Sequence, residues 1–229
     1  MKSTKNDPVV NINNIVETDY LWGKQTLPEL VEGKLFDYVV ASHVIEHVPN
    51  MLGWMREIAS VLKDGGILSL AIPDKRYTFD HKRDLTSLGT LVESYLMDKR
   101  RPGIRDIFDQ ESMATKVDMY EAWSKNFDPQ TLKHHGNLQM ALQLSRGYLL
   151  SDEYSDVHVN IMTPASFLMI LEQASQIGLF DFVVVDFYPT TVNSHEFLVS
   201  LRRVSREYSQ EENLALQLES FLNIKENLV

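Results

Sequence analysis

The feature that most constrains the fold is a pair of short apolar runs joined by one helical segment. Residues 36–41 (FDYVVA) are rich in β-branched and aromatic side chains, which is typical of a strand buried on both faces. Residues 51–62 place apolar side chains three and four positions apart, which predicts one buried helical stripe. Gly65 and Gly66 end that helix, and residues 67–72 form the second strand. This order predicts two parallel strands with a right-handed crossover.

The rest of the chain extends this unit into an α/β domain. Residues 76–160 are polar and mostly helical, which predicts an insertion directly after the second strand. Thr163 and Pro164 suit the N-cap and the first turn of another helix. Residues 180–188 and 196–201 are two further strand-like runs, and the short connection between them predicts an antiparallel hairpin.

The C-terminal end predicts an amphipathic helix. Its apolar face carries three leucines and a phenylalanine, Leu214, Leu218, Phe221 and Leu222. Such a face packs on its own domain or joins two copies of the chain. We therefore expect residues 1–205 to form one α/β domain, with the insertion at about 76–160, and residues 206–229 to form the helix.

Composition excludes several classes of protein. The chain has 22 basic and 32 acidic residues, and its net charge of −10 repels phosphate backbones, so we expect no nucleic-acid partner. It has no cysteine, and therefore no disulfide and no thiolate nucleophile or metal ligand. No apolar run is long enough to cross a bilayer, and the first ten residues lack the apolar core of a secretion signal. We expect a cytoplasmic protein.

Three segments resemble the second half of class I S-adenosylmethionine-dependent methyltransferases. They are FDYVVASHVIEHVPN at 36–50, VLKDGGILSLAIPD at 61–74 and DFVVVDFYPTTVNSHEFLVSLRR at 181–203. In that family an acidic residue opens the fourth strand, as Asp37 does here, and a Glu-His pair such as Glu46-His47 follows it. The resemblance implies a Rossmann-like fold with a mostly parallel sheet, a helical insertion and an antiparallel C-terminal hairpin. The string IPDKRYTFD is also similar to a bacterial subgroup associated with cell-surface sugar chemistry.

One element of the family is missing from the sequence. The family places a glycine-rich cofactor loop after its first strand and an acidic ribose ligand after its second. Upstream of residue 33 this chain has only Gly23, and residues 9–17 are similar to the family's third strand. We therefore expect an N-terminally truncated fold in which the strand at 36–41 has an open edge. Residues 9–16, a second copy, or the remainder of a longer protein would cover that edge.

The resemblance and the sheet together predict the site residues. Ligands of open α/β sheets bind beyond the carboxyl ends of the strands. The predicted catalytic residues are His43, Asp74 and Tyr77, with His43 as general base because imidazole titrates near neutral pH. The predicted cofactor contacts are Glu17, Asp19, Ala41, Ser42 and His43, and the predicted acceptor contacts are Lys75, Arg76 and His158. The structural alternatives are a helix-turn cap for His43, a loop ion-pair cluster for residues 74–76 and a core histidine at position 158.

We expect methyl transfer from S-adenosylmethionine to an oxygen or nitrogen atom of a small molecule or sugar. A non-catalytic binding or scaffold module, dimerising through the open edge of strand 36–41 or the C-terminal helix, is the alternative from another class. A third hypothesis reads residues 43–47 as the H-x-x-E-H zinc motif of a metallopeptidase, with Glu46 as base and Glu121 as third ligand. Pro49 ends the helix that such a motif needs, so we expect no metal ligand.

Overall fold

The computed structural model describes residues 16–23 and 25–227 of the chain. The strand expected within residues 9–17 lies almost wholly outside the described residues. In the described part, Glu17 and Asp19 belong to an exposed segment without regular secondary structure. The position of the predicted third strand therefore stays a prediction.

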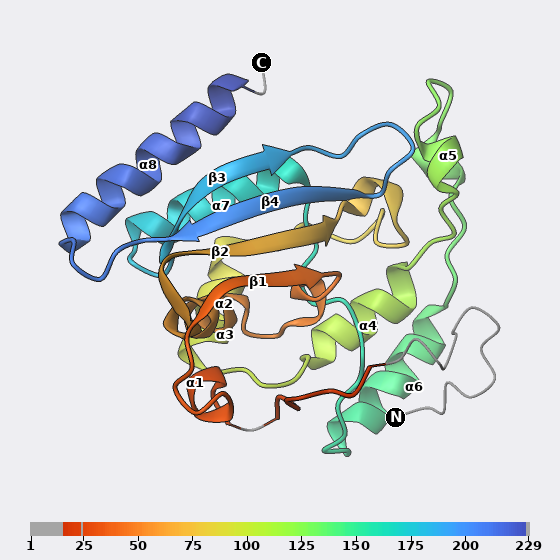
Figure 1. The fold of residues 1–229 in the computed structure, drawn as a ribbon. Coiled ribbons are helices and arrows are strands. Elements are labelled where there is room, and N and C mark those ends of the chain that lie inside the picture. The colour runs from red at the N-terminus through yellow and green to blue at the C-terminus, as the bar shows by residue number, and fades with distance from the viewer. Residues whose placement is uncertain (1–15, 24, 228–229) are drawn as a thin grey trace.

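Four strands form one mixed sheet in the order β1–β2–β4–β3 (Figure 1). They are β1 (Phe36–Ser42), β2 (Leu62–Pro73), β3 (Phe182–Tyr188) and β4 (Glu196–Arg203). β1 pairs with β2 in parallel, whereas β2 with β4 and β3 with β4 are antiparallel. The parallel unit and the C-terminal hairpin confirm the predicted α/β class. The expected mostly parallel sheet is wrong for the described strands, because the hairpin supplies half of them and pairs antiparallel with β2.

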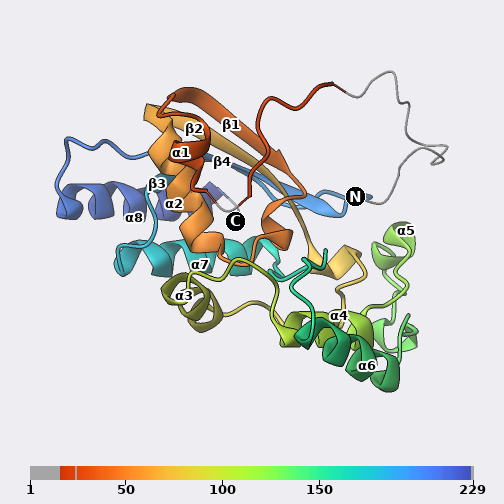
Figure 2. The same ribbon diagram turned by 90° about the horizontal axis from the view of Figure 1, so that it is seen from below.

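Helices cover one side of this sheet (Figure 2). The helices are α1 (Leu27–Leu30), α2 (Met51–Val61), α3 (Leu88–Leu96), α4 (Ile104–Met113), α5 (Met119–Ala122), α6 (Leu138–Leu149), α7 (Pro164–Gln176) and α8 (Gln210–Asn227), with 3-10 turns η3 (Ile45–His47), η4 (Lys75–Tyr77) and η5 (Pro129–Thr131). α2, α3 and α7 lie beneath the sheet, and α4 to α6 lie beyond the end to which β1 and β2 point. Every described helix is too short or too polar to cross a bilayer.

Local chemistry explains where these elements begin and turn. The Asn50 side chain accepts a hydrogen bond from the Gly53 amide at 2.9 Å and caps α2, and Thr163 caps α7 as its sequence predicted. Gly65 and Gly66 lie inside β2 and not, as the sequence predicted, at the end of α2, because the helix already ends at Val61. A Cβ atom on Gly66 would lie 2.9 Å from the carbonyl oxygen of Lys63 and 3.2 Å from that of Asp37. A larger residue there would separate β2 from β1.

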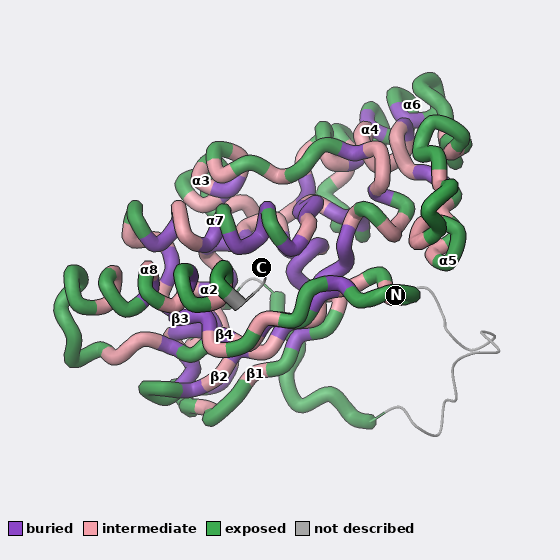
Figure 3. The backbone as a smooth tube through the Cα atoms, turned by 90° about the horizontal axis from the view of Figure 1, so that it is seen from above, coloured by how far each residue is buried: buried purple, intermediate pink, exposed green. Residues whose placement is uncertain are grey.

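The hydrophobic core lies between α2, α7 and the inner face of the sheet (Figure 3). Leu68 and Ile72 of β2 and Val199 of β4 are fully buried on this face. The outer face differs, since Tyr38 is 70% exposed and Val40 is 69% exposed. The prediction that this strand is buried on both faces is therefore wrong, because β1 is an edge strand and no described helix covers its outer side.

The C-terminal helix α8 packs on β3 and α7 of its own chain. Phe221 is fully buried, and the Gln217 Nε2 atom donates hydrogen bonds to the carbonyl oxygens of Phe180 and Phe182. Leu222 is 57% exposed and lies outside the packed face. The sequence allowed this helix either to pack on its own domain or to join two copies of the chain. The burial of Phe221 shows packing on its own domain.

Candidate active site

The C-terminal ends of β1 and β2 lie beside the first residues of β4 at one end of the strands. We call this end the carboxyl edge, as distinct from the open side of the edge strand β1. Ser42 is in register with Ala71, and Pro73 is in register with Glu196. Because β4 runs antiparallel to β2, its beginning reaches the edge at which β2 ends. The sequence prediction had His43 and Asp74 at this edge but omitted Glu196. The predicted antiparallel hairpin was the signal that could have identified Glu196, because Glu196 is the first residue of its second strand.

His43 and Glu196 form a close pair at this edge. The Nε2 atom of His43 lies 2.6 Å from Oε2 of Glu196, and about a third of each side chain is exposed. The backbone of His43 is left-handed, with φ 52°, and its amide donates to the Ala71 carbonyl at 3.0 Å. Such a conformation is uncommon outside glycine and concentrates at functional sites. A donated Nε2–H fixes the imidazole on Glu196 and leaves Nδ1 as its basic nitrogen.

Asp74 has a structural environment. It is fully buried, and its carboxylate accepts hydrogen bonds from the Arg76 guanidinium, from the Arg76 amide and from the Thr190 hydroxyl. The hydrogen bond to Asp74 raises the pKa of Arg76. These contacts give Asp74 a structural role in the loop, and its predicted catalytic role stays a prediction. The loop ion-pair cluster considered from sequence is the arrangement found.

Tyr77 and Lys75 join the insertion to the sheet. The Tyr77 ring stacks on Trp123 of the insertion, with ring centroids 4.1 Å apart and an interplanar angle of 6°. Trp123 in turn donates from Nε1 to the carbonyl of Ser194 in the β3–β4 connection. Burial raises the pKa of Tyr77 and lowers that of Lys75. Because its pKa is raised, Tyr77 keeps its proton at neutral pH and does not act as a base there. Binding of the methyl acceptor by Lys75 stays a prediction.

A cavity of about 700 Å³ lies beside the segment that follows β1. Its wall combines aromatic rings with charged groups of both signs, from Trp22, His43, His47, Trp54, Glu57, Lys99, Arg100, Tyr154 and Asp156 among others. This volume suits a small organic ligand, and aromatic walls with a few polar groups are typical of such sites. A substrate bound in this cavity would therefore contact the exposed part of the His43 side chain.

The predicted cofactor contacts are only partly brought together. His43 lines the cavity, whereas Glu17, Asp19, Ala41 and Ser42 do not. Gly23 is the one glycine of its wall, and the described residues contain no glycine-rich turn at this edge. S-adenosylmethionine needs close backbone amides for its carboxylate and an acidic group for its ribose. The described residues do not form that complete cradle.

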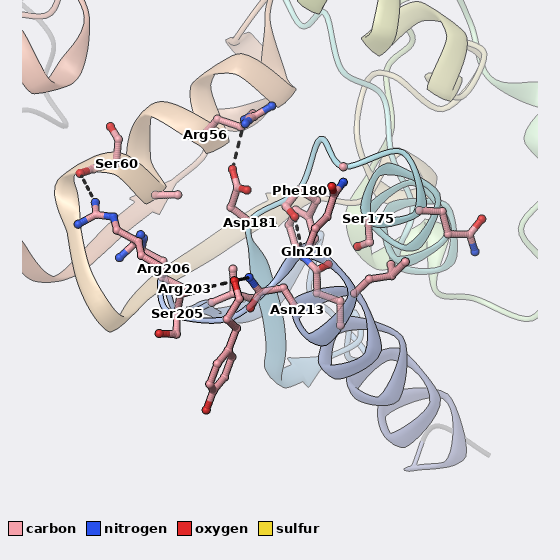
Figure 4. A pocket seen from close by; sticks show the side chains of 17 residues that line it. Arg56, Ser60, Ser175, Phe180, Asp181, Arg203, Ser205, Arg206, Gln210 and Asn213 are labelled. Carbon is pink, nitrogen blue, oxygen red and sulfur yellow. Dashed lines mark hydrogen bonds and ion pairs between the residues drawn. The ribbon is translucent and has the colours of Figure 1, made fainter.

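A second cavity, of about 670 Å³, lies at the other end of the sheet (Figure 4). It is lined where α2 and α7 end, β3 begins and β4 leads to α8, with Arg56 paired to Asp181 at 3.2 Å. The Arg206 side chain donates to the Ser60 carbonyl across it. Because ligands of α/β sheets bind at the carboxyl ends of parallel strands, this opposite end is not our candidate site.

The described residues thus form an α/β sheet with an imidazole and a carboxylate at the carboxyl edge of its parallel strands, which is where ligands of such sheets bind. A family model described as a methyltransferase domain matches residues 5–174. The chain therefore belongs to the methyltransferase-domain family, and the predicted resemblance to class I S-adenosylmethionine-dependent enzymes is confirmed.

Solved structures and curated proteins add less. A crystal structure of a SAM-dependent methyltransferase from Methanosarcina mazei is 14% identical, with a TM-score of 0.33, over 75% of this chain and 60% of that chain. The chain thus spans about 60% of the length of that structure. No curated protein matches. Family membership rests on the family model alone.

Proposed function

We propose that the protein methylates an oxygen or nitrogen atom of a small molecule or sugar, with S-adenosylmethionine as donor. The observation that carries the proposal is the pair formed by His43 and Glu196 at the carboxyl edge, with Nε2 and Oε2 2.6 Å apart and with His43 lining the cavity. An acceptor hydroxyl or ammonium group must lose a proton when it gains a methyl group. A positioned histidine is the commonest general base for such a step.

Each group has a separate role in this proposal. His43 takes the acceptor proton, while Glu196 orients the ring through Nε2. The aromatic rings of Trp22 and Trp54 give the acceptor an apolar wall, and Lys99 and Arg100 provide donors for its polar groups. S-adenosylmethionine, the cofactor of the family, supplies the methyl group. Methyl transfer then depends mainly on how closely the two reactants are positioned.

The first experiment asks whether this chain binds the donor. Calorimetric titration with S-adenosylhomocysteine is expected to give saturable binding in the micromolar range. Absence of heat at millimolar ligand would support the alternative hypothesis, a methyltransferase-like binding module without catalysis.

The second experiment tests the histidine–carboxylate pair. Methyl transfer to a panel of sugars and small hydroxylated or amino compounds is measured with the wild type, His43→Ala, Glu196→Gln and the control His135→Ala, whose side chain is exposed outside the site. Loss of the base should lower kcat by about 100-fold to 10,000-fold with little change in KM. Glu196→Gln should lower kcat less and move its pH profile. Equal activity in all four proteins would contradict the assignment of His43.

The exposed outer face supports a second proposal, self-association along β1. Tyr38 and Val40 on β1, with Leu198 and Tyr188 on the hairpin, are large apolar side chains exposed on that face. The unpaired backbone of an edge strand is a template for another strand. A two-fold pairing of β1 with a second copy would satisfy the unpaired backbone of this edge strand.

A further inference from the structure

Glu46 is a buried carboxylate without a hydrogen-bond partner. Its side chain is 1% exposed, and neither Oε1 nor Oε2 receives a hydrogen bond from any described residue. Oε1 lies 3.5 Å from Nδ1 of His43 and 3.7 Å from Nε2 of His47. An unpaired buried carboxylate costs several kcal/mol. A positive group therefore belongs beside it.

Two imidazoles converge on this carboxylate. Glu46 and His47 come from η3, and His158 comes from the segment before α7. One ligand atom from each of the three residues lies within 4.8 Å of the other two. The His47 and His158 rings meet edge to face, with centroids 4.7 Å apart. This is a compact set of one oxygen and two nitrogen ligands.

A carboxylate lies behind each histidine, and the one behind His158 is hydrogen-bonded to its ring. Nδ1 of His158 lies 2.5 Å from Oδ2 of Asp80, and the Arg83 guanidinium holds Asp80 at 2.8 Å. Nδ1 of His47 lies 2.8 Å from Oδ1 of Asp156, within ion-pair distance but without hydrogen-bond geometry. The Nε2 lone pairs are then free. A carboxylate on the far nitrogen of the imidazole is typical of metal-binding histidines.

The backbone holds this arrangement together before any ion binds. The Asn160 side chain donates to the carbonyl oxygens of Ile45 and Val48 at 2.8 Å each, and the amides of Val159 and Asn160 donate to the Glu46 carbonyl. These bonds fix η3 against the segment that carries His158. The three ligand groups are therefore preorganised, which lowers the cost of binding an ion.

We propose that Glu46, His47 and His158 bind a divalent transition-metal ion, with Zn²⁺ as its representative. Imidazole nitrogens suit Zn²⁺ and its neighbours, whereas Mg²⁺ and Ca²⁺ prefer sites made of oxygen atoms. Three protein ligands leave at least one coordination position for water or substrate. His47 also lines the 700 Å³ cavity, so the ion would sit at its wall.

This site differs from the metallopeptidase motif considered from sequence. That motif needs His43 and His47 on one helix, but His43 ends β1 with a left-handed backbone and His47 lies in a short 3-10 turn. Glu121, the expected third ligand, does not belong to a cluster of potential metal ligands among the described residues. Here Glu46 is a ligand rather than a base. The sequence predicted no metal ligand, and the proposed site departs from that prediction.

The test measures metal binding directly and does not depend on methyl transfer. Chain stripped with a chelator is titrated with Zn²⁺, and separately with Mg²⁺, by calorimetry, and bound zinc is counted by mass spectrometry. We expect one Zn²⁺ per chain and no Mg²⁺ binding. Glu46→Gln and His158→Ala should weaken Zn²⁺ binding at least 100-fold, and Asp80→Asn about 10-fold to 100-fold. The control His135→Ala should bind as the wild type does.

Two results would overturn the proposal. One is a wild-type chain that takes up no Zn²⁺ at micromolar concentration. The other is Zn²⁺ binding that Glu46→Gln leaves unchanged, since this near-isosteric variant keeps the volume of the side chain. Substitution with Co²⁺ adds a spectroscopic check, because its visible bands should appear in the wild type and vanish in Glu46→Gln. Far-UV circular dichroism confirms that each variant is folded.

Discussion

Replacement of Asn160 by alanine tests how the edge of the sheet is held in place. Asn160 is buried, and its amide donates to the carbonyl oxygens of Ile45 and Val48, both at 2.8 Å. The Ile45 carbonyl keeps a second donor, the Val48 amide at 3.3 Å, whereas the Val48 carbonyl has no other donor among the described residues. The variant therefore loses two hydrogen bonds and leaves one buried carbonyl unpaired.

The size of the effect follows from these contacts. A hydrogen bond contributes about 1 kcal/mol net, and an orphaned buried acceptor costs about 1–3 kcal/mol. Asn160→Ala should thus lower the free energy of unfolding by about 2–4 kcal/mol. For a chain of this length that change lowers Tm by about 5–15 °C.

Urea and thermal unfolding followed by circular dichroism measure this change. The matched control is Asn213→Ala, because the Asn213 amide also donates to two carbonyl oxygens, at 3.2 and 3.4 Å, in a more exposed place. We expect the control to lose less than about 1 kcal/mol. If Asn160→Ala loses no more than the control, the two bonds to η3 do not hold this edge.

Three further predictions concern the packing and the surface. Phe221→Ala should destabilise the fold by about 3–5 kcal/mol in urea unfolding, whereas the control Leu222→Ala on the exposed face should change it by less than about 0.5 kcal/mol. In alkaline absorbance titration, Tyr77→Phe should remove a tyrosinate that forms at higher pH than an ordinary tyrosine, because burial raises the pKa of Tyr77. Any stability from the raised Tyr77 pKa is present below about pH 10 and is lost as pH rises through that pKa. Val40→Lys should leave Tm unchanged but abolish self-association in light scattering; a dimer that persists would contradict pairing through β1.

The two proposals about the edge concern different groups and separate in experiment. His43 lines the cavity and pairs with Glu196, whereas Glu46 is buried, with Oε1 3.5 Å from Nδ1 of His43. A chain that binds Zn²⁺ but not S-adenosylhomocysteine would support the metal site and contradict S-adenosylmethionine as the methyl donor. Binding of S-adenosylhomocysteine without Zn²⁺ would support the proposed donor and contradict the metal site. Neither outcome depends on the other.

Local sequence determined the elements and the family. Apolar periodicity located β1, α2 and β2 because a strand and an amphipathic helix each leave a repeat that survives without tertiary contacts. Thr163 and Pro164 marked the start of α7 for the same reason, since capping is a local interaction. The motifs at 36–50 and 61–74 carried the resemblance to methyltransferases.

Only the tertiary structure decided which side chains work together. Glu196 is 153 positions from His43, and His158 is 78 from Asp80, so neither pair leaves a local pattern. Burial was equally hidden, because the residue type of Val40 does not say that its face of the sheet is uncovered. Asp74 was predicted from the sequence to be catalytic, but its pairing with Arg76 and Thr190 is visible only in the fold. Contacts between distant segments depend on how the strands pair, and that pairing is a property of the whole fold.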